Sequence, residues 1–380
     1  MTKEKLRIGI AGCGWIAKHA HLPALAKDKR VNIKAAFDIN LIRAKEVCNE
    51  FLIQYAFDDF RQFLDCGLDG IIIATPNFTH VPYTMEALRR KINVLCEKPV
   101  GFKEEEMQKI IKLSEENDVV YVPGFVNRWR QDIKTIYDLI QSGRLGEINQ
   151  VDAGWIRKYG VPRPGTWFTN KKYSGGGVLM DLGSHIIDIC GLFLGTRKPL
   201  QFELLTCLCN TEKIKHSGEA GWFQSNDICE YEINVEDTAI GRIMFEGQAV
   251  INVSLSWLAP VEADCTYFKV KGSKGEVMLK TLFGFSNERL WKDDLLVCDT
   301  TVSQTRQCFN KNENQTRNAF TEMLSYFVDA IISKKKGFTD GKDAKNTVLL
   351  IENLYKNAQV NERKCLEILS RGSQFWNNFI

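Results

Sequence analysis

The sequence predicts an α/β protein whose first third is a doubly wound, parallel sheet. Three observations lead to this fold class. Short apolar strands alternate with helices, a glycine-rich turn follows the first strand, and polar residues stand at the ends of several strands. Ligands bind at the carboxyl edge of such sheets, where these strand ends meet. We therefore expect the polar residues to gather at one ligand site.

The glycine-rich turn begins directly after the predicted strand 6–10. It matches the pattern G-x-G-x-x-A as Gly12-x-Gly14-x-x-Ala17. In this pattern the first glycine permits a tight turn, the second lets the backbone approach a diphosphate, and the alanine lets the helix pack on the strand. The N-terminus of the following helix offers its N–H groups to the phosphates. The turn therefore predicts a Rossmann dinucleotide-binding domain over residues 1–125.

An aspartate stands at the end of the second predicted strand. Asp38 follows Gly12 by 26 residues, near the spacing at which a carboxylate accepts hydrogen bonds from the ribose of NAD. That carboxylate would repel the 2′-phosphate of NADP, so we predict NAD rather than NADP. Arg43 nearby would soften this preference. The structural alternative is that Asp38 caps a helix or forms a turn.

Two further apolar strands end in polar residues. One ends at Thr75-Pro76-Asn77, with His80 in the helix that follows, and the other ends at Glu97-Lys98-Pro99. Proline cannot donate to a sheet and restricts the preceding residue to extended backbone, so Lys98 is held at the carboxyl end of a buried strand. The structural alternatives are a lysine that turns to solvent and a histidine that only starts a helix.

After residue 125 the pattern changes. The link 125–129 contains Asn127, a candidate cofactor contact, and Arg128, a candidate substrate contact. A strand predicted over 148–157 then leads into residues 158–167, which are rich in proline, glycine, basic and aromatic residues. Such a loop suits a polyhydroxylated or anionic ligand, because rings stack on sugar faces and cations bind oxygen atoms. The alternative is a solvated surface loop.

Three glycines at 175–177 precede a predicted helix over 178–194 that is apolar nearly all round and therefore buried. Asp181, His185 and Asp188 stand at i, i+4 and i+7 and form a single stripe. Buried polar groups are unfavourable unless they are partnered. The stripe predicts a catalytic pair in which His185 exchanges a proton near neutral pH and Asp181 orients it, with a structural cluster as the alternative. No third ligand accompanies them, so we expect no metal.

Composition excludes several classes of function. The 380 residues suffice for two domains, and 50 basic residues against 47 acidic ones give no reason to expect a nucleic-acid or membrane partner. No apolar run reaches membrane-spanning length, and the N-terminus contains no signal-peptide core. The 12 cysteines are scattered without a C-x-x-C. We therefore expect reduced, mostly buried thiols in a cytoplasmic protein.

Taken in this order, the motifs resemble the glucose–fructose oxidoreductase / inositol dehydrogenase family, often called Gfo/Idh/MocA. The resemblance rests on Gly12-x-Gly14-x-x-Ala17, Ala74-Thr75-Pro76-Asn77 with His80, Glu97-Lys98-Pro99, and Gly175-Gly176-Gly177 leading to Asp181-x-x-x-His185. It implies a second α/β domain over residues 126–380, with a large, open, mostly antiparallel sheet. That sheet commonly serves as the interface of a homo-oligomer, here a dimer, tetramer or hexamer. The stretches 210–228 and 361–380 match no motif.

The resemblance also implies an NAD(P)-dependent oxidoreductase that transfers hydride between nicotinamide and a secondary hydroxyl or ketone of a sugar, glycoside or cyclitol, such as C3 of a hexose. Lys98 would lie near the nicotinamide, and either Lys98 or His185 would take the hydroxyl proton. Two alternatives stay open: an enzyme that uses NAD without net redox change, such as a glycosidase or epimerase-like member, and a non-catalytic NAD(P)-binding regulator. The candidate cofactor contacts are Gly12, Gly14, Trp15, Ile16, Asp38, Arg43, Thr75, Pro76, Asn77, His80, Glu97, Lys98 and Asn127. The candidate substrate contacts are Lys98, Arg128, Arg157, Lys158, Trp167, Tyr173, Asp181 and His185.

Overall fold

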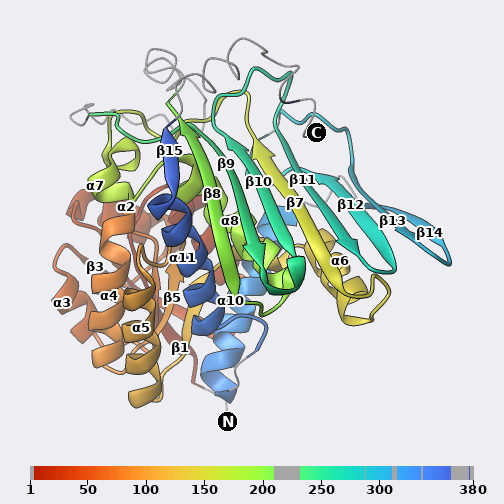
Figure 1. The fold of residues 1–380 in the computed structure, drawn as a ribbon. Helices are drawn as coiled ribbons and strands as arrows, with labels where there is room; N and C mark the ends of the chain where they lie inside the picture. Colours follow the sequence, from red (N-terminus) through yellow and green to blue (C-terminus); the bar gives the residue numbers. More distant parts are fainter. Residues whose placement is uncertain are drawn as a thin grey trace. The chain divides into compact units, whose positions relative to one another are not determined.

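The computed structural model describes residues 4–208, 232–286, 288–309, 315–334, 337–360 and 376. They form two compact units (Figure 1). The first holds the residues up to Trp129 together with Arg317–Val348, and the second holds Arg130–Thr316 and the described residues from Leu349 onward. The stretch 210–228 lies outside the described residues, as does the tail 361–380 except for Trp376.

The first unit is built on a six-stranded parallel sheet in the order β3-β2-β1-β4-β5-β6. Because β1 pairs with β2 on one side and with β4 on the other, the chain winds away from β1 in both directions, and this confirms the doubly wound sheet. The strands are β1 (Leu6–Ala11), β2 (Val31–Phe37), β3 (Tyr55–Phe57), β4 (Gly70–Ile73), β5 (Asn93–Glu97) and β6 (Tyr121–Gly124).

Some of the helices that connect these strands begin at a residue whose side chain caps the helix. The Asn40 side chain accepts the N–H groups of Ile42 and Arg43, and Asp59 accepts the N–H of Gln62. The helix after the glycine-rich turn contains a π-helical stretch, η1, which a pattern of 3.6 residues per turn does not predict. The helices are η1 (Ala17–His21), α1 (Leu22–Leu25), α2 (Leu41–Phe51), α3 (Phe60–Asp65), α4 (Asn77–Arg89), α5 (Glu104–Glu116) and η2 (Val126–Trp129).

Two helices from the far end of the chain, α10 (Gln315–Ser333) and α11 (Gly341–Lys356), contribute to the first unit. At Gly70 in β4, a Cβ atom would lie 3.0 Å from Ile331 and 3.2 Å from Phe327, both in α10. The first turns of α11 add Ala344 and Val348 to the core of this unit. The units therefore differ from the predicted division into 1–125 and 126–380, which followed the order of the chain.

The second unit is built on a nine-stranded sheet in the order β14-β13-β12-β11-β7-β10-β9-β8-β15. Two pairs, β7 with β10 and β8 with β15, are parallel and the others are antiparallel, which confirms a mostly antiparallel sheet. The strands are β7 (Ile148–Ile156), β8 (Pro199–Cys207), β9 (Thr238–Phe245), β10 (Val250–Ser256), β11 (Cys265–Gly272), β12 (Gly275–Thr281), β13 (Asp294–Thr300), β14 (Gln304–Phe309) and β15 (Ala358–Val360).

Helix α8 (Val178–Leu194) packs against β7, β9 and β10, and α6 (Gln131–Gln141) packs against α8 (Figure 1). Within the described residues, the stretch Lys171–Leu194 contains an 18-residue window that is long and apolar enough to cross a membrane by length and composition alone. Of that window, 89% is buried inside the protein, as in the core helix of a folded domain. The remaining short helices are η3 (Trp167–Thr169), α7 (Lys171–Ser174) and η5 (Glu246–Gln248).

Among the cysteines that the structure describes, the prediction of reduced thiols fails for one. Cys13, Cys48, Cys96, Cys190, Cys265 and Cys298 are buried free thiols, Cys66 is a half-buried free thiol and Cys308 is an exposed one. Cys207 is disulfide-bonded, which corrects the prediction of reduced thiols for this residue. The prediction of reduced thiols was based on the lack of a signal-peptide core in the sequence. That observation does not indicate whether two cysteines lie close enough in the fold to form a disulfide.

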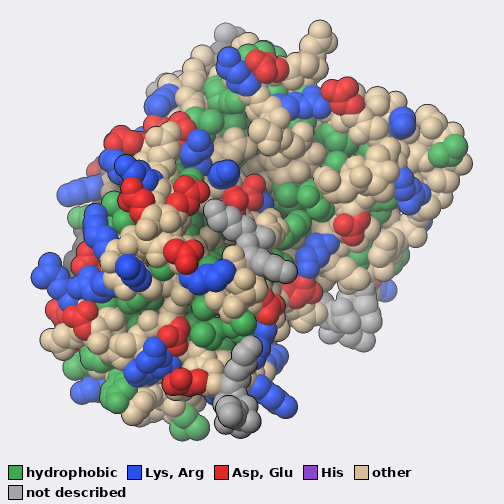
Figure 2. All heavy atoms as spheres, turned by 90° about the horizontal axis from the view of Figure 1, so that it is seen from below, with side chains coloured by type: hydrophobic (Ala, Val, Ile, Leu, Met, Phe, Trp, Pro, Cys, Tyr) green, Lys and Arg blue, Asp and Glu red, His purple; other side chains and the backbone are tan. Residues whose placement is uncertain are grey.

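Basic and acidic side chains are interspersed on the face seen in Figure 2. Neither sign dominates this face, as the near-equal numbers of basic and acidic residues lead one to expect.

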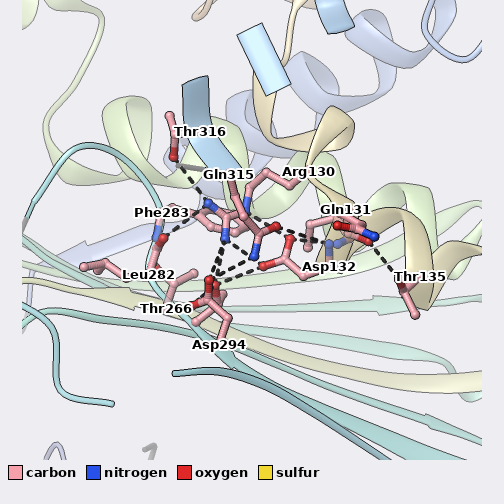
Figure 3. Close-up of polar contacts among 12 residues, drawn as sticks. Arg130, Gln131, Asp132, Thr135, Thr266, Leu282, Phe283, Asp294, Gln315 and Thr316 are labelled. Atoms are coloured by element: carbon pink, nitrogen blue, oxygen red, sulfur yellow. Dashed lines mark hydrogen bonds and ion pairs between the residues drawn. The ribbon is translucent and has the colours of Figure 1, made fainter. Parts of the chain in front are cut away.

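A buried polar network ties the start of the second unit to its exit (Figure 3). The guanidinium of Arg130 donates to both carboxylate oxygens of Asp132 at 3.0 and 2.7 Å, to Thr281 at 2.8 Å, and to Thr316 and the Leu282 carbonyl at 3.3 Å. Arg130 is 2% exposed and Asp132 is fully buried. Because the chain enters this unit at Arg130 and leaves it at Thr316, the network joins the two crossings.

We predict that Arg130→Ala lowers the free energy of unfolding by about 3–5 kcal/mol, because it leaves the Asp132 carboxylate buried without its cation. Urea denaturation followed by circular dichroism measures this change. The matched control is Arg144→Ala, since Arg144 is exposed and a surface substitution changes stability by about 0.5 kcal/mol or less. Equal stability of the two variants would contradict the role given to the network.

Candidate functional site

The glycine-rich turn is fixed between β2 and β4 of the first unit. The N–H of Gly12 donates to the Phe37 carbonyl at 2.8 Å. Gly12 has a φ of +91°, and a Cβ atom there would lie 2.4 Å from the carbonyl oxygen of Ala74, so only glycine fits. At Gly14, by contrast, a Cβ atom would meet no described atom within 4 Å. This open space is what a diphosphate needs beside the second glycine, so the turn fits a dinucleotide.

Asp38 joins the end of β2 to this turn. Its Oδ2 accepts the N–H of Cys13 at 3.0 Å, its Oδ1 accepts the N–H of Asn40 at 2.9 Å, and Arg43 lies 3.5 Å from Oδ1. A carboxylate oxygen has two lone pairs, so acceptor capacity is left for ribose hydroxyls. Burial, with a smaller contribution from Asp38, raises the pKa of the Cys13 thiol to about 12. Cys13 therefore stays protonated and is no nucleophile.

His80 connects the ends of β4 and β5. Its Nδ1 lies 2.8 Å from the carbonyl oxygen of Pro99, and its Nε2 lies 2.8 Å from that of Thr75. Burial lowers the pKa of His80, while the two carbonyls act in the opposite direction. His80 thereby holds the backbone on both sides of the edge that carries Thr75, Pro76, Asn77 and Lys98.

Glu97 holds the backbone of Lys98. Its Oε2 accepts the N–H of Lys98 at 3.1 Å, and its Oε1 lies 2.8 Å from Nε2 of His21. His21 is fully buried and packs edge-on against Phe320. Sequence reasoning missed His21, because a histidine in the first helix carries no signal for a partner 76 residues away. The Lys98 side chain is partly exposed at the end of the strand.

The other predicted contacts of the first unit lie at two places. Trp15 and Ile16 are half-buried at the start of the helix after the turn. Asn127 and Arg128 are buried in η2, where Arg128 donates to Asp343 at 2.9 Å and to the Phe338 carbonyl at 3.4 Å. These contacts tie η2 to the start of α11. The substrate contact of Arg128 stays a prediction.

In the second unit, α8 carries Asp181 and His185 one turn apart. Oδ2 of Asp181 accepts the indole N–H of Trp257 at 3.0 Å. The His185 ring lies 5.9 Å from the ring of Trp155 in β7. Asp181 is 8% exposed, His185 is 7% exposed and Asp188 is 1% exposed. Sequence reasoning missed Trp257, since nothing at the end of a strand indicates its partner on a distant helix.

Arg157 joins this cluster from the end of β7. Its guanidinium carbon lies 4.8 Å from the centre of the Trp155 ring, and its Nη1 donates to the Gly160 carbonyl at 3.2 Å. Burial lowers the pKa of Arg157, whereas the Asp181 and Asp264 carboxylates act in the opposite direction. The backbone N–H of Lys158 donates to Asp264 at 2.9 Å. Of the residues predicted for the substrate, the second unit therefore gathers Arg157, Asp181 and His185 around Trp155 and Trp257.

The aromatic residues predicted for the substrate lie in the loop between β7 and α8. The Trp167 ring lies 4.9 Å from Phe168, and Phe168 lies 6.3 Å from Trp257. The ring of Tyr173 lies 5.3 Å from the ammonium of Lys172. Trp167 is thus connected to the Asp181 cluster through Phe168, and Tyr173 lies beside a cation.

Glu236 holds the N-terminus of α8. Its Oε1 accepts the N–H groups of Gly177 at 3.0 Å and Leu179 at 3.1 Å and the hydroxyl of Tyr355 at 2.7 Å. A Cβ atom on Gly176 would lie 1.9 Å from the Tyr355 hydroxyl, and one on Gly177 would lie 1.9 Å from the Glu236 carbonyl. The close approach explains these two glycines. A carboxylate at a helix N-terminus is also favourable toward the helix dipole.

Two family models match the chain. Residues 6–125 match the model described as oxidoreductase family, NAD-binding Rossmann fold, and residues 133–278 match the GFO/IDH/MocA C-terminal domain. Both units of the structure are therefore represented in one family.

Relatives and solved structures agree with this match. The chain is 28% identical over 284 residues to a putative UDP-kanosamine synthase oxidoreductase subunit of Amycolatopsis mediterranei (strain S699), covering 75% of this chain and 77% of the relative. It is 28% identical over 258 residues to D-glucoside 3-dehydrogenase of Escherichia coli (strain K12), covering 68% and 72%. The crystal structure of GenD2 from gentamicin A biosynthesis in complex with NAD aligns with a TM-score of 0.73 and 20% identity, covering 94% of this chain and 95% of that one.

We predict different effects for alanine at the two glycines of the turn: Gly12→Ala lowers stability, and Gly14→Ala lowers cofactor affinity. Gly12→Ala strains a positive φ and drives a Cβ atom into the backbone of Ala74, so the protein loses thermal stability. Gly14→Ala enters open space, so thermal stability is kept while the affinity for NADH, measured by fluorescence titration, falls about tenfold or more. Wild-type NADH affinity in Gly14→Ala would show that the diphosphate lies elsewhere.

We predict that Glu236 makes stability depend on pH. Burial raises its pKa above the ordinary 4.5, against the effect of its hydrogen bonds. The folded state then binds a proton more readily than the unfolded state, so the free energy of unfolding falls as pH rises above 4.5 through the raised pKa. Glu236→Gln keeps an acceptor oxygen without the charge, so its stability should fall less over this range in urea denaturation. The exposed control Glu203→Gln should follow the wild type, and equal pH profiles for all three proteins would refute this role.

Proposed function

Since the chain belongs to the GFO/IDH/MocA family of NAD(P)-dependent oxidoreductases, we propose that it transfers hydride between the nicotinamide and a secondary hydroxyl or ketone of a sugar, glycoside or cyclitol. The observation that carries the proposal is the cluster on α8. Asp181 and His185 stand one turn apart, beside Trp155, Trp257 and Arg157 in a largely buried setting.

The cofactor supplies the centre that accepts or donates the hydride. We assign its diphosphate to Gly12 and Gly14 with Trp15 and Ile16, and its adenosine ribose to Asp38 with Arg43 nearby. The open face of Gly14 and the engaged but unsaturated carboxylate of Asp38 support this assignment. The end of β4, with Thr75, Pro76, Asn77 and His80, and the residues Glu97, Lys98 and Asn127 complete the proposed cofactor contacts. A carboxylate at the ribose favours NAD over NADP.

The proton chemistry is assigned to Lys98 and His185. The substrate hydroxyl loses a proton as its carbon loses hydride, and a positioned base accelerates this step by about 10²–10⁴-fold. Lys98 offers an ammonium that stabilises the developing alkoxide, and His185 offers an imidazole that takes the proton. Asp181 places a carboxylate on the same helix to favour the imidazolium. Either Lys98 or His185 serves as the base in this proposal.

The substrate side is proposed from the relatives and from the loop after β7. One relative is named D-glucoside 3-dehydrogenase, which supports C3 of a hexose as the reacting position. We assign contacts with the sugar to Arg157, Lys158, Trp167 and Tyr173, with Arg128 as a further candidate. The relatives named above are an oxidoreductase subunit and a dehydrogenase, so we favour net redox chemistry over a transient use of NAD and over a regulator.

We also propose that the protein is a cytoplasmic homo-oligomer that assembles through the open sheet of the second unit. The resemblance to the family, in which such a sheet commonly serves as the oligomer interface, is what supports the oligomer.

The proposed function is tested by cofactor reduction with a panel of sugars. Purified protein is incubated with NAD or NADP and with methyl glucosides, glucose 6-phosphate, UDP-glucose or myo-inositol, and absorbance at the NADH band is followed. We expect NADH with at least one compound and a ketone product by mass spectrometry. A changed sugar without net NADH would favour transient use of NAD. NADH binding without turnover of any panel sugar would favour the regulator.

We predict that Lys98→Ala lowers kcat by about 10²–10³-fold, because the developing alkoxide loses its positioned cation. NADH affinity should stay within about threefold of wild type, since the backbone of the strand end is held by Glu97 rather than by the lysine side chain. The matched control is Lys112→Ala, whose side chain is 76% exposed. An equal loss of kcat and of NADH affinity would mean that Lys98 holds the cofactor instead.

A further inference from the structure

Trp376, in the tail 361–380, is fully buried in an apolar cluster of the second unit. Burying an aromatic side chain removes about 150–250 Å² from water, so this position is strongly favoured over an exposed one. We call the group of residues around it the Trp376 cluster. Its other buried members are Ile156, Cys207, Ala259, Val261, Cys265 and Tyr267, and the half-buried residues packed against them are Leu205, Ile240, Met278, Leu290 and Trp291.

The strands place this cluster on the face of the nine-stranded sheet opposite α8. On the α8 side, a Cβ atom at Gly183 would lie 3.0 Å from Leu255. The ring of Phe193, also in α8, lies 5.8 Å from that of Phe268. Side chains alternate between the two faces along a strand, so Tyr267 points away from α8, to what we call the open face. The strand register brings further members of the cluster to this face: Ile156, Leu205, Cys207, Ile240, Cys265 and Met278.

A polar row crosses the open face away from Trp376. It runs over β8, β9, β10, β7 and β11 and consists of Glu203, Arg242, Asn252, Asp152 and Lys269. All five are exposed or half-buried. By contrast, Ile156 and Cys265 are fully buried and Tyr267 is 3% exposed. The open face is therefore accessible to solvent along the polar row and closed at the end that holds Trp376.

We propose that Trp376 covers the apolar end of the open face and thereby keeps a second copy of the chain from associating there. Without the indole, apolar groups that are now buried would form an exposed patch, and such patches favour self-association. Trp376 itself is fully buried within its own chain, so it offers no surface to a neighbour. A homo-oligomer built through this sheet uses the rest of the open face while Trp376 is in place. The inference does not depend on the proposed reaction.

The first test asks whether Trp376 is covered in solution. Since the chain has 8 tryptophans, the emission of Trp376 is obtained as the difference between the wild type and Trp376→Phe, which keeps an aromatic ring. We expect this difference emission to resist quenching by iodide, because the indole is fully buried. Quenching as strong as that of free tryptophan overturns the proposal.

The second test measures self-association by sedimentation velocity over a concentration series. Trp376→Ser should lower the apparent dissociation constant for self-association by about tenfold or more, because it uncovers the apolar end of the open face. Trp376→Leu, which fills part of the space and is expected to keep the fold, should lie between Trp376→Ser and the wild type. Trp376→Phe should match the wild type. Equal or weaker association of Trp376→Leu and Trp376→Ser overturns the proposal.

A second substitution locates the new contact. Ile240 lies half-buried on the open face, so adding Ile240→Lys to Trp376→Leu should return self-association to the wild-type level. The matched control is Ile42→Lys in the same background, because Ile42 is 70% exposed in α2 of the first unit. It should leave the increased association in place. Reversal by Ile42→Lys, or persistence with Ile240→Lys, would place the contact elsewhere and overturn the proposal.

Discussion

The placement of α8 is the constraint on which the candidate chemistry of the second unit depends. Glu236 fixes the register of this helix by accepting two of its N-terminal N–H groups, and Tyr355 holds that carboxylate in place. The absence of side chains at Gly176 and Gly177 is what permits the contact. Because Asp181 and His185 stand on the first turns of the same helix, a shift at its start would move both away from Trp257 and Trp155.

In the first unit, the candidate site residues are positioned by contacts at the carboxyl ends of the strands. Gly12 donates a hydrogen bond to the end of β2 and lies close to the backbone that follows β4. His80 contacts carbonyl groups that follow β4 and β5, and Glu97 at the end of β5 contacts His21. The contacts of Gly12 and His80 join neighbouring strands near their carboxyl ends, and the contact of Glu97 joins β5 to the helix η1. Of the residues that we assign to the chemistry and to the cofactor, Lys98 is held through its backbone N–H and Asp38 through its carboxylate. The Asp38 carboxylate keeps acceptor capacity for ribose hydroxyls in this arrangement.

The fold and much of the candidate site were readable in the sequence because they obey local rules. The turn at Gly12, the strand ends at Asp38 and Lys98, and the stripe on α8 each follow from spacing within one or two elements. What escaped prediction are partners distant in the chain: His21 with Glu97, Trp257 with Asp181, and Glu236 with the glycines before α8. Strand β14 also escaped, because five of its six residues are exposed and show no apolar alternation.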